Sequence, residues 1–221
     1  MTYRKITFGD NKFYHVFNRS VADEKIFYGI EELERAISLI QFYRYKPLMS
    51  YSVFKRISSE EQHRYIEHIS RYQALINIHA FSLMPNHHHF LLEQKQDDGV
   101  SQFVSNLQNS FAKYFNKKNS RRGSLFCEMF KAVHIKTQEQ YVHVSRYIHL
   151  NHVTSGLISL DDLDFYPYSS FSCYMENNKM EFVYKDMILA IFGGKERYRA
   201  FVRNHADYQK SLHIIKKLTL D

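Results

Sequence analysis

Residues 84–93 read Met-Pro-Asn-His-His-His-Phe-Leu-Leu-Glu and follow an apolar run, 76–84. The Pro-Asn pair has the chemistry of a tight turn, so the sequence predicts a strand, a turn and a second strand. Side chains alternate along a strand, which places His87 and His89 on one face and His88 on the other. Two imidazoles on one face, with Cα atoms roughly 6–7 Å apart, can converge on a metal ion. The same residues are also compatible with a polar strand whose imidazoles face water. The histidines alone therefore do not distinguish a metal site from a solvent-exposed strand.

The composition of the 221-residue chain is that of a soluble globular protein with more basic than acidic residues. It holds 30 Lys and Arg against 23 Asp and Glu, and hydrophobic residues make up 44%. The excess of positive charge favours a polyanionic partner. The chain also has 17 Tyr, 18 Phe and no Trp, and such rings among basic residues suit a surface on which bases stack. The competing interpretation is that most of these rings are core.

Two cysteines, Cys127 and Cys173, are the only ones in the sequence. They predict no disulfide framework, so the expected location is a reducing cytoplasm. No apolar run approaches the length of a membrane span, and the first residues lead into no signal region.

The remaining pattern alternates strands and helices, as expected for one domain with a helical tail. We expect a strand over 12–21, helices over 31–45 and 100–118, strand-like residues over 124–136, and a helix from Thr137 to about Asn151. Ser58 and Glu61 form a capping-box pattern that begins a short charged helix, expected to decorate the fold. Ser101 is the expected cap of the helix over 100–118. Two further amphipathic segments, 186–192 and 196–204, are separated by Gly193-Gly194.

A basic segment lies between residues 113 and 136, with seven Lys and Arg against one acid, Glu128. A solvated face explains many such runs, but these charges stand beside aromatic residues and favour a groove that follows phosphates. The candidates for DNA contacts are Arg19, Lys117, Lys118, Arg121, Arg122 and Lys131.

The helix after Thr137 carries a polar stripe of His143, Tyr147 and Asn151, four residues apart. Two imidazoles and one amide oxygen would leave coordination positions open and suit Mg²⁺ or Mn²⁺. Tyr147 would then lie one turn from the ion, where its phenol could attack a bound phosphate. His143 is more commonly a surface imidazole.

Other candidates are more easily explained as structural groups. His15 and His79 lie in strands and are expected to be core or sheet-face groups. Tyr141 is expected in the core and is the second choice as nucleophile.

Five segments resemble the HUH-type single-tyrosine transposases, which include the REP-associated tyrosine transposases. They are 13–19 (Phe-Tyr-His-Val-Phe-Asn-Arg), 84–89 (Met-Pro-Asn-His-His-His), 121–126 (Arg-Arg-Gly-Ser-Leu-Phe), 147–151 (Tyr-Ile-His-Leu-Asn) and 166–170 (Tyr-Pro-Tyr-Ser-Ser). The resemblance runs from Lys12 to about Tyr174. Five motifs in the same order are far more specific than one.

The resemblance implies an α+β, ferredoxin-like antiparallel sheet with packed helices. It implies that His87, His89 and Asn151 bind Mg²⁺ or Mn²⁺ and that Tyr147 is the nucleophile. The implied activity is cleavage and rejoining of single-stranded DNA at hairpin-flanked sites through a 5′-phosphotyrosine. We expect a transposase domain over 1–174 and a helical extension over 175–221, which favours a monomer over a homodimer that exchanges its tyrosine helix.

The sequence departs from the family pattern at four places. His88 stands where a hydrophobic residue is usual, and His152 replaces the Pro after Asn151. Residues 127–129, Cys-Glu-Met, replace Gln-Gly-Arg, and Tyr168 replaces Trp. None of these changes the nucleophile.

Two other classes of function compete with the transposase hypothesis. A catalytically reduced protein could bind a DNA hairpin without cutting it, as the altered 127–129 segment allows. A metal-dependent hydrolase could use water in place of tyrosine, and it would need a carboxylate base, for which Glu93 is the candidate. Only the transposase predicts a tyrosine-linked intermediate.

Overall fold

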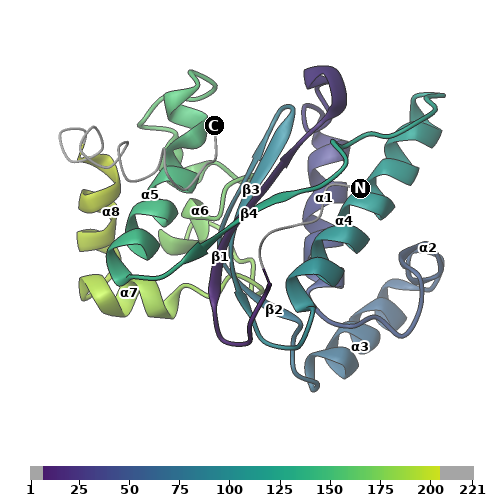
Figure 1. Cartoon of the computed structure of the whole chain (residues 1–221), viewed down its shortest axis with the longest axis horizontal. Helices are drawn as coiled ribbons and strands as arrows, with labels where there is room; N and C mark the ends of the chain where they lie inside the picture. Colours follow the sequence, from purple (N-terminus) through teal and green to yellow (C-terminus); the bar gives the residue numbers. More distant parts are fainter. Residues whose placement is uncertain (1–6, 205–221) are drawn as a thin grey trace.

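The computed structural model describes residues 7–204, in which four antiparallel strands form one sheet between two groups of helices (Figure 1). The strands are β1 (Phe13–Arg19), β2 (Ile76–Met84), β3 (His87–Gln94) and β4 (Lys131–Ile135). Their order across the sheet is β2-β3-β1-β4.

Two helices each connect strands that follow one another along the chain but are not adjacent in the sheet. Helix α1 (Ile30–Tyr43) connects β1 to β2, and α4 (Gly99–Lys118) connects β3 to β4. A βαββαβ chain with this strand order is the ferredoxin-like arrangement, so the predicted fold class is confirmed.

The histidine segment forms the predicted hairpin, in which β2 is the edge strand of the sheet and β3 is an internal strand. Met84 pairs with His87 across the turn, and β3 lies between β2 and β1. On its other side β3 pairs with β1, so that His89 lies opposite Phe17 and His87 opposite Arg19. The predicted alternation is therefore fixed by two neighbouring strands, because a slip by one residue would reverse both faces.

One face of the sheet is covered by α1 and α4 and is apolar. The insertion between α1 and β2 carries α2 (Tyr51–Phe54) and α3 (Ser59–Ser70), both outside the sheet layers. The predicted capping box is present, because Ser58 Oγ accepts from the Glu61 amide at 3.2 Å and Glu61 accepts from the Ser58 amide at 2.8 Å. Buried aromatic rings of α1, α2 and α3 pack together: Phe42, Tyr51, Phe54 and Tyr65.

Helix α5 (Gln138–Thr154) covers the opposite face and packs mainly against β2. Thr137 caps it as predicted, with its hydroxyl accepting from the Gln140 amide at 3.1 Å. Gln140 does not complete a capping box, since its side chain accepts from the Lys136 amide. The helix continues one turn beyond the predicted end at Asn151.

The C-terminal segment returns along α5. It contains a short 3-10 turn η2 (Leu163–Phe165), α6 (Phe171–Tyr174), α7 (Asp186–Phe192) and α8 (Lys195–Arg203). The predicted break lies at Gly193, whose φ of +70° ends α7 in a conformation that favours glycine.

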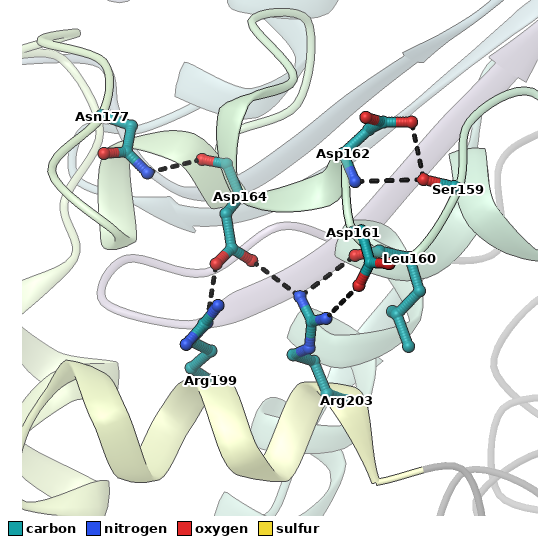
Figure 2. Close-up of polar contacts among 8 residues, drawn as sticks. All are labelled: Ser159, Leu160, Asp161, Asp162, Asp164, Asn177, Arg199 and Arg203. Atoms are coloured by element: carbon teal, nitrogen blue, oxygen red, sulfur yellow. Dashed lines mark hydrogen bonds and ion pairs between the residues drawn. The ribbon is translucent and has the colours of Figure 1, made fainter.

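Helix α8 is fixed by arginine–carboxylate contacts, shown in Figure 2. Arg199 and Arg203 lie 2.6 Å and 3.2 Å from the carboxylate of buried Asp164, and Arg203 also lies 2.9 Å from Asp161. The extension thus packs against the main body of the protein up to residue 204. The predicted division at 174/175 stays a prediction, and 205–221 lie outside the described residues.

Two local predictions are wrong. Ser101 is not the cap of α4, because the helix already begins at Gly99, after Asp98 in a left-handed conformation (φ +55°). Only 131–135 of the expected strand over 124–136 form β4, while Phe126 makes an isolated bridge to Ser20. A loop with scattered aromatic anchors has the same apolar pattern as a strand.

No helix among residues 7–204 is long and apolar enough to cross a membrane.

Candidate functional site

A cavity of about 240 Å³ opens on the α5 side of the sheet. It is enclosed by β1, β3, α5 and the loop before β4. The lining residues are Phe17, Asn18, Arg19, His87, His89, Cys127, Met129, Lys131 and Tyr147. Three of the four predicted catalytic and metal-binding residues are therefore together: His87, His89 and Tyr147.

His87 and His89 lie side by side, with ring centroids 5.0 Å apart and planes at 85°. Nδ1 of His87 is 2.6 Å from the side-chain oxygen of Asn86, and an amide oxygen can only accept, so Nδ1 carries the proton. Nδ1 of His89 is 3.0 Å from Nε2 of His15. Nε2 of His87 is then the nitrogen that can be offered to a metal ion, and Nε2 of His89 is available in the tautomer in which Nδ1 donates to His15.

The environment keeps His89 neutral. Burial lowers its pKa well below the ordinary value, and the neighbouring His15 and His87 lower it further. A metal ligand must present an unprotonated nitrogen. His89 therefore meets this requirement at neutral pH without losing a proton.

Tyr147 lies against the same histidine. Its ring is edge-on to His89 at a centroid distance of 5.4 Å and edge-on to His15 at 5.9 Å. The side chain is half-buried and forms part of the cavity wall. The α5 backbone thus holds a phenol next to the paired imidazoles.

Asn151 follows Tyr147 by one helical turn and is buried at 6% exposure. Its Nδ2 has no hydrogen-bond partner. Helix α5 runs alongside β2 toward the hairpin turn, because Tyr141 contacts His79 while His152 bonds the Leu83 carbonyl. Asn151 therefore lies on the part of α5 nearest the turn that carries His87.

The side chain of Asn151 fits a ligand position, although it does not line the cavity. A buried amide with an unpaired end is costly unless a further partner binds it, and rotation of the amide would present its oxygen. Among residues 7–204 no three His, Cys, Asp or Glu side chains gather as a metal site. A third protein ligand would consequently be an amide such as this one.

Positive charge dominates the cavity wall. Among residues 7–204, Arg19 and Lys131 line it, while no Asp or Glu does. The Lys131 ammonium lies over the Phe17 ring, 5.8 Å from its centroid. The Arg19 guanidinium makes an exposed, long contact of 3.8 Å with Asp23. Such a cavity suits an anion.

The structure does not bring the other predicted DNA-contact residues into the cavity. Lys118 lies 2.7 Å from Glu31 and 2.5 Å from Glu32, and Arg121 lies 2.7 Å from Glu24. These cations are engaged within the chain. Lys117 and Arg122 are exposed on the surface.

The alternative residues are engaged elsewhere. Glu93 accepts from Asn77 and Lys95 and contacts His79. Burial opposes its ionisation, but these contacts lower the pKa of Glu93 to about 2. It is also about 14 Å along β3 from His89, so it cannot act as the base of a hydrolase here.

Tyr141 and His143 also lie outside the cavity. Tyr141 is buried, its hydroxyl is 2.7 Å from Nδ1 of His79, and burial raises its pKa. His143 contacts Arg146 and the ring of Phe201. The second-choice nucleophile is therefore a structural group.

Sequence reasoning missed two contributions to the site. His15, expected to be a core or sheet-face group, is buried but bonds directly to His89. Its place on the same face of β1 as Phe17 was the available signal. Cys127 and Met129, noted only as departures near a groove, line the cavity itself.

Comparisons with known proteins identify the family and the fold. A family model described as IS200-like transposase matches residues 45–151. No curated protein matches the chain.

Among solved structures, a REP-associated tyrosine transposase bound to a REP hairpin aligns with a TM-score of 0.52 and 15% identity. The alignment covers 80% of this chain and 86% of that one, and at this identity it supports a shared fold. A proposed transposase from Deinococcus radiodurans R1 aligns at 15% identity over 67% of this chain and 95% of that one. Its TM-score of 0.33 does not support a shared fold.

Proposed function

Because the chain belongs to the IS200-like family of HUH-type single-tyrosine transposases, we propose that it cleaves and rejoins single-stranded DNA through a 5′-phosphotyrosine intermediate. The observation that carries this proposal is the position of Tyr147. Its ring touches His89 in a cavity whose described lining also includes His87 and two cations but no carboxylate. A tyrosine beside an anion-binding metal site has the requirements for phosphoryl transfer.

The proposed substrate is a single strand next to a hairpin. The structural neighbour with the shared fold was solved with a REP hairpin bound. In this chain, Arg19 and Lys131 would contact the phosphates that enter the cavity. The cavity volume of about 240 Å³ is too small for a duplex, so the scissile phosphate would enter as part of an unpaired strand.

The proposed reaction has two balanced steps. In cleavage, the Tyr147 oxygen attacks the scissile phosphorus and loses its proton to solvent, while the bond from phosphorus to the 3′ oxygen breaks. The leaving oxygen takes up a proton and becomes a free 3′ hydroxyl. In rejoining, another 3′ hydroxyl loses its proton and attacks the phosphotyrosine phosphorus, the bond from phosphorus to the Tyr147 oxygen breaks, and the released phenolate takes up a proton. The ester conserves the bond energy, so no nucleotide cofactor is required.

His87, His89 and Asn151 would hold the metal ion, Mg²⁺ or Mn²⁺. When bound, the ion would neutralise charge on the phosphate oxygens and orient the scissile group. Because no carboxylate of residues 7–204 lines the cavity, the phosphate would be the anionic partner of the ion. The protein residues contribute the rest: α5 positions the phenol, and Arg19 and Lys131 hold the strand.

We propose a monomer as the active form. His87, His89, Tyr147 and Asn151 all come from one chain, and α5 packs against β2 of its own sheet. A homodimer that exchanges α5 would have to replace these contacts in both subunits. Size measurement of the active DNA complex would separate the two states.

A hairpin-binding protein that no longer cuts is the second candidate. The cavity wall itself favours it, since Cys127 and Met129 stand in the wall where the family pattern has Gln and Arg. Loss of that Arg would weaken the hold on the strand.

Covalent trapping separates the two functions. The protein is incubated with labelled hairpin oligonucleotides that carry single-stranded flanks, with Mg²⁺ or Mn²⁺, and is resolved on denaturing gels. We expect a protein–DNA adduct that Tyr147→Phe and His87→Ala abolish and Tyr141→Phe retains. Binding without any adduct would favour the second candidate, and an adduct formed by Tyr147→Phe would refute the assigned nucleophile.

A further inference from the structure

We infer that His15 is a positioning residue of the site, which accepts a hydrogen bond from Nδ1 of His89 and so holds His89 in the tautomer that can bind a metal ion. This inference rests on the proposed function, because it takes His89 as a ligand.

The contact between the two rings is short and fully enclosed. Nε2 of His15 is 3.0 Å from Nδ1 of His89, and the rings stack with centroids 5.2 Å apart and planes at 20°. His15 has 0% exposure and His89 has 5%. With both side chains shielded from water, the hydrogen bond has no solvent competitor.

The chemistry of binding determines the direction of this hydrogen bond. If His15 donated, Nδ1 of His89 would accept, and its proton would lie on Nε2. A protonated Nε2 has no lone pair for a metal. Only the opposite arrangement, in which His89 donates from Nδ1 to His15, leaves Nε2 of His89 available.

His87, the neighbouring candidate ligand, also has a hydrogen-bond partner at Nδ1, the side-chain amide of Asn86. Nδ1 of His87 donates to the Asn86 oxygen, and Asn86 is held in turn by a contact of 3.1 Å from its Nδ2 to Asp23. Each imidazole of the pair thus has a partner at Nδ1. Partners of this kind fix the tautomer and ring orientation of metal-binding histidines.

His15 also touches the nucleophile. Its ring is edge-on to Tyr147 at 5.9 Å, so one buried side chain contacts both His89 and the phenol-bearing residue. The other buried histidines of β2 and α5 have structural partners: His79 bonds Tyr141, His149 bonds Tyr198 and Ser170, and His152 bonds a carbonyl.

The test measures metal binding and tautomer state without DNA cleavage. Mn²⁺ is titrated into the full-length protein and free Mn²⁺ is followed by electron paramagnetic resonance. His15→Phe keeps a ring but removes the acceptor, while His15→Gln keeps an acceptor oxygen. His79→Gln is the matched control, because it alters an equally buried histidine of the sheet away from the cavity. Circular dichroism checks that each variant is folded.

We expect His15→Phe to weaken Mn²⁺ binding by about 10–100-fold. His15→Gln should recover most of the affinity, and His79→Gln should bind like the wild type. In ¹⁵N spectra of the metal-free protein, the ring of His89 should be protonated at Nδ1 in the wild type. His15→Phe should give a mixture of the two tautomers.

Two results would overturn the inference in distinguishable ways. If His15→Phe is folded and binds Mn²⁺ as tightly as the wild type, while His87→Ala does not bind, the metal site stands and His15 has no positioning role. If the wild type shows no saturable Mn²⁺ binding, with or without a hairpin oligonucleotide, the metal site of the proposed function fails as well.

Discussion

The two faces of the central sheet carry the same type of residue in opposite circumstances. On the α1–α4 face, His88 is enclosed by Phe27 and Phe126. On the α5 face, His87 and His89 open onto a cavity with Tyr147. Consecutive histidines are thus separated by the pleat of one strand into a core residue and two candidate ligands.

The difference shows that the partners of a histidine, more than its residue type, decide its role. His88 has 1% exposure, its Nδ1 has no partner, and Gln108 approaches its Nε2 only at 3.4 Å. Nδ1 of each ligand candidate has a defined partner, Asn86 or His15. The α5 face therefore holds its imidazoles through defined hydrogen bonds, and the other face encloses one imidazole among aromatic rings.

Acid should destabilise both sides of the sheet, since each side contains a buried neutral histidine. Burial lowers the pKa of His88 and of His149 to about 3, whereas both titrate near 6.5 when unfolded. Between about pH 6.5 and pH 3 the unfolded chain binds these protons and the folded chain does not. The free energy of unfolding is therefore highest above pH 6.5 and decreases as the pH falls through this range. Each histidine lowers the free energy of unfolding by up to about 1.4 kcal/mol per pH unit. The two together lower it by about 4 kcal/mol between neutral pH and pH 5.

Urea unfolding at pH 7, 6 and 5 would measure this loss. His88→Leu removes one of the two groups, so its stability should fall less steeply with acid. Equal slopes for this variant and the wild type would show that His88 does not control the acid response.

The alternation that separates these histidines could be read from the sequence, because a period of two and a Pro-Asn turn are local signals. The helix cap at Thr137 and the break at Gly193 are local in the same sense, and they too are confirmed. The ferredoxin-like topology came from the resemblance of ordered motifs, since pattern alone did not fix the strand order.

The contacts that could not be predicted from the sequence are those between segments far apart along the chain. The bond of His15 to His89 requires the β1–β3 register, which joins residues 74 positions apart. The engagement of Lys118 and Arg121 by glutamates likewise depends on how α1 and its preceding loop meet the end of α4. A charge run in a sequence does not reveal which cations the fold neutralises.

Ion pairs also hold the C-terminal helix α8 on the α5 side of the sheet. Asp164 has a side-chain exposure of 7% and faces Arg199 and Arg203 (Figure 2). Asp164→Asn should lower the free energy of unfolding by about 2 kcal/mol, because it leaves two arginines without their buried acceptor. The estimate is below that for a fully buried pair, since both arginines are partly exposed.

An exposed ion pair on the same extension provides the control. Glu176 and Lys195 are in contact at the surface, so Glu176→Gln should change stability by less than about 0.5 kcal/mol. Chemical denaturation of both variants would measure the difference. Equal effects would mean that α8 is held by its apolar contacts, among them the buried Tyr198.

Removal of the His88 imidazole should change stability in the opposite direction. His88→Leu replaces an enclosed imidazole that has an unpaired nitrogen with an apolar side chain of similar size. Removal of an unsatisfied buried polar group stabilises a protein by about 1 kcal/mol, less whatever the weak contact with Gln108 contributes. We expect a higher melting temperature together with unchanged adduct formation, because His88 points away from Tyr147. A loss of adduct in a stable His88→Leu protein would mean that the middle histidine serves the site, and the division of roles between the two faces of β3 would fail.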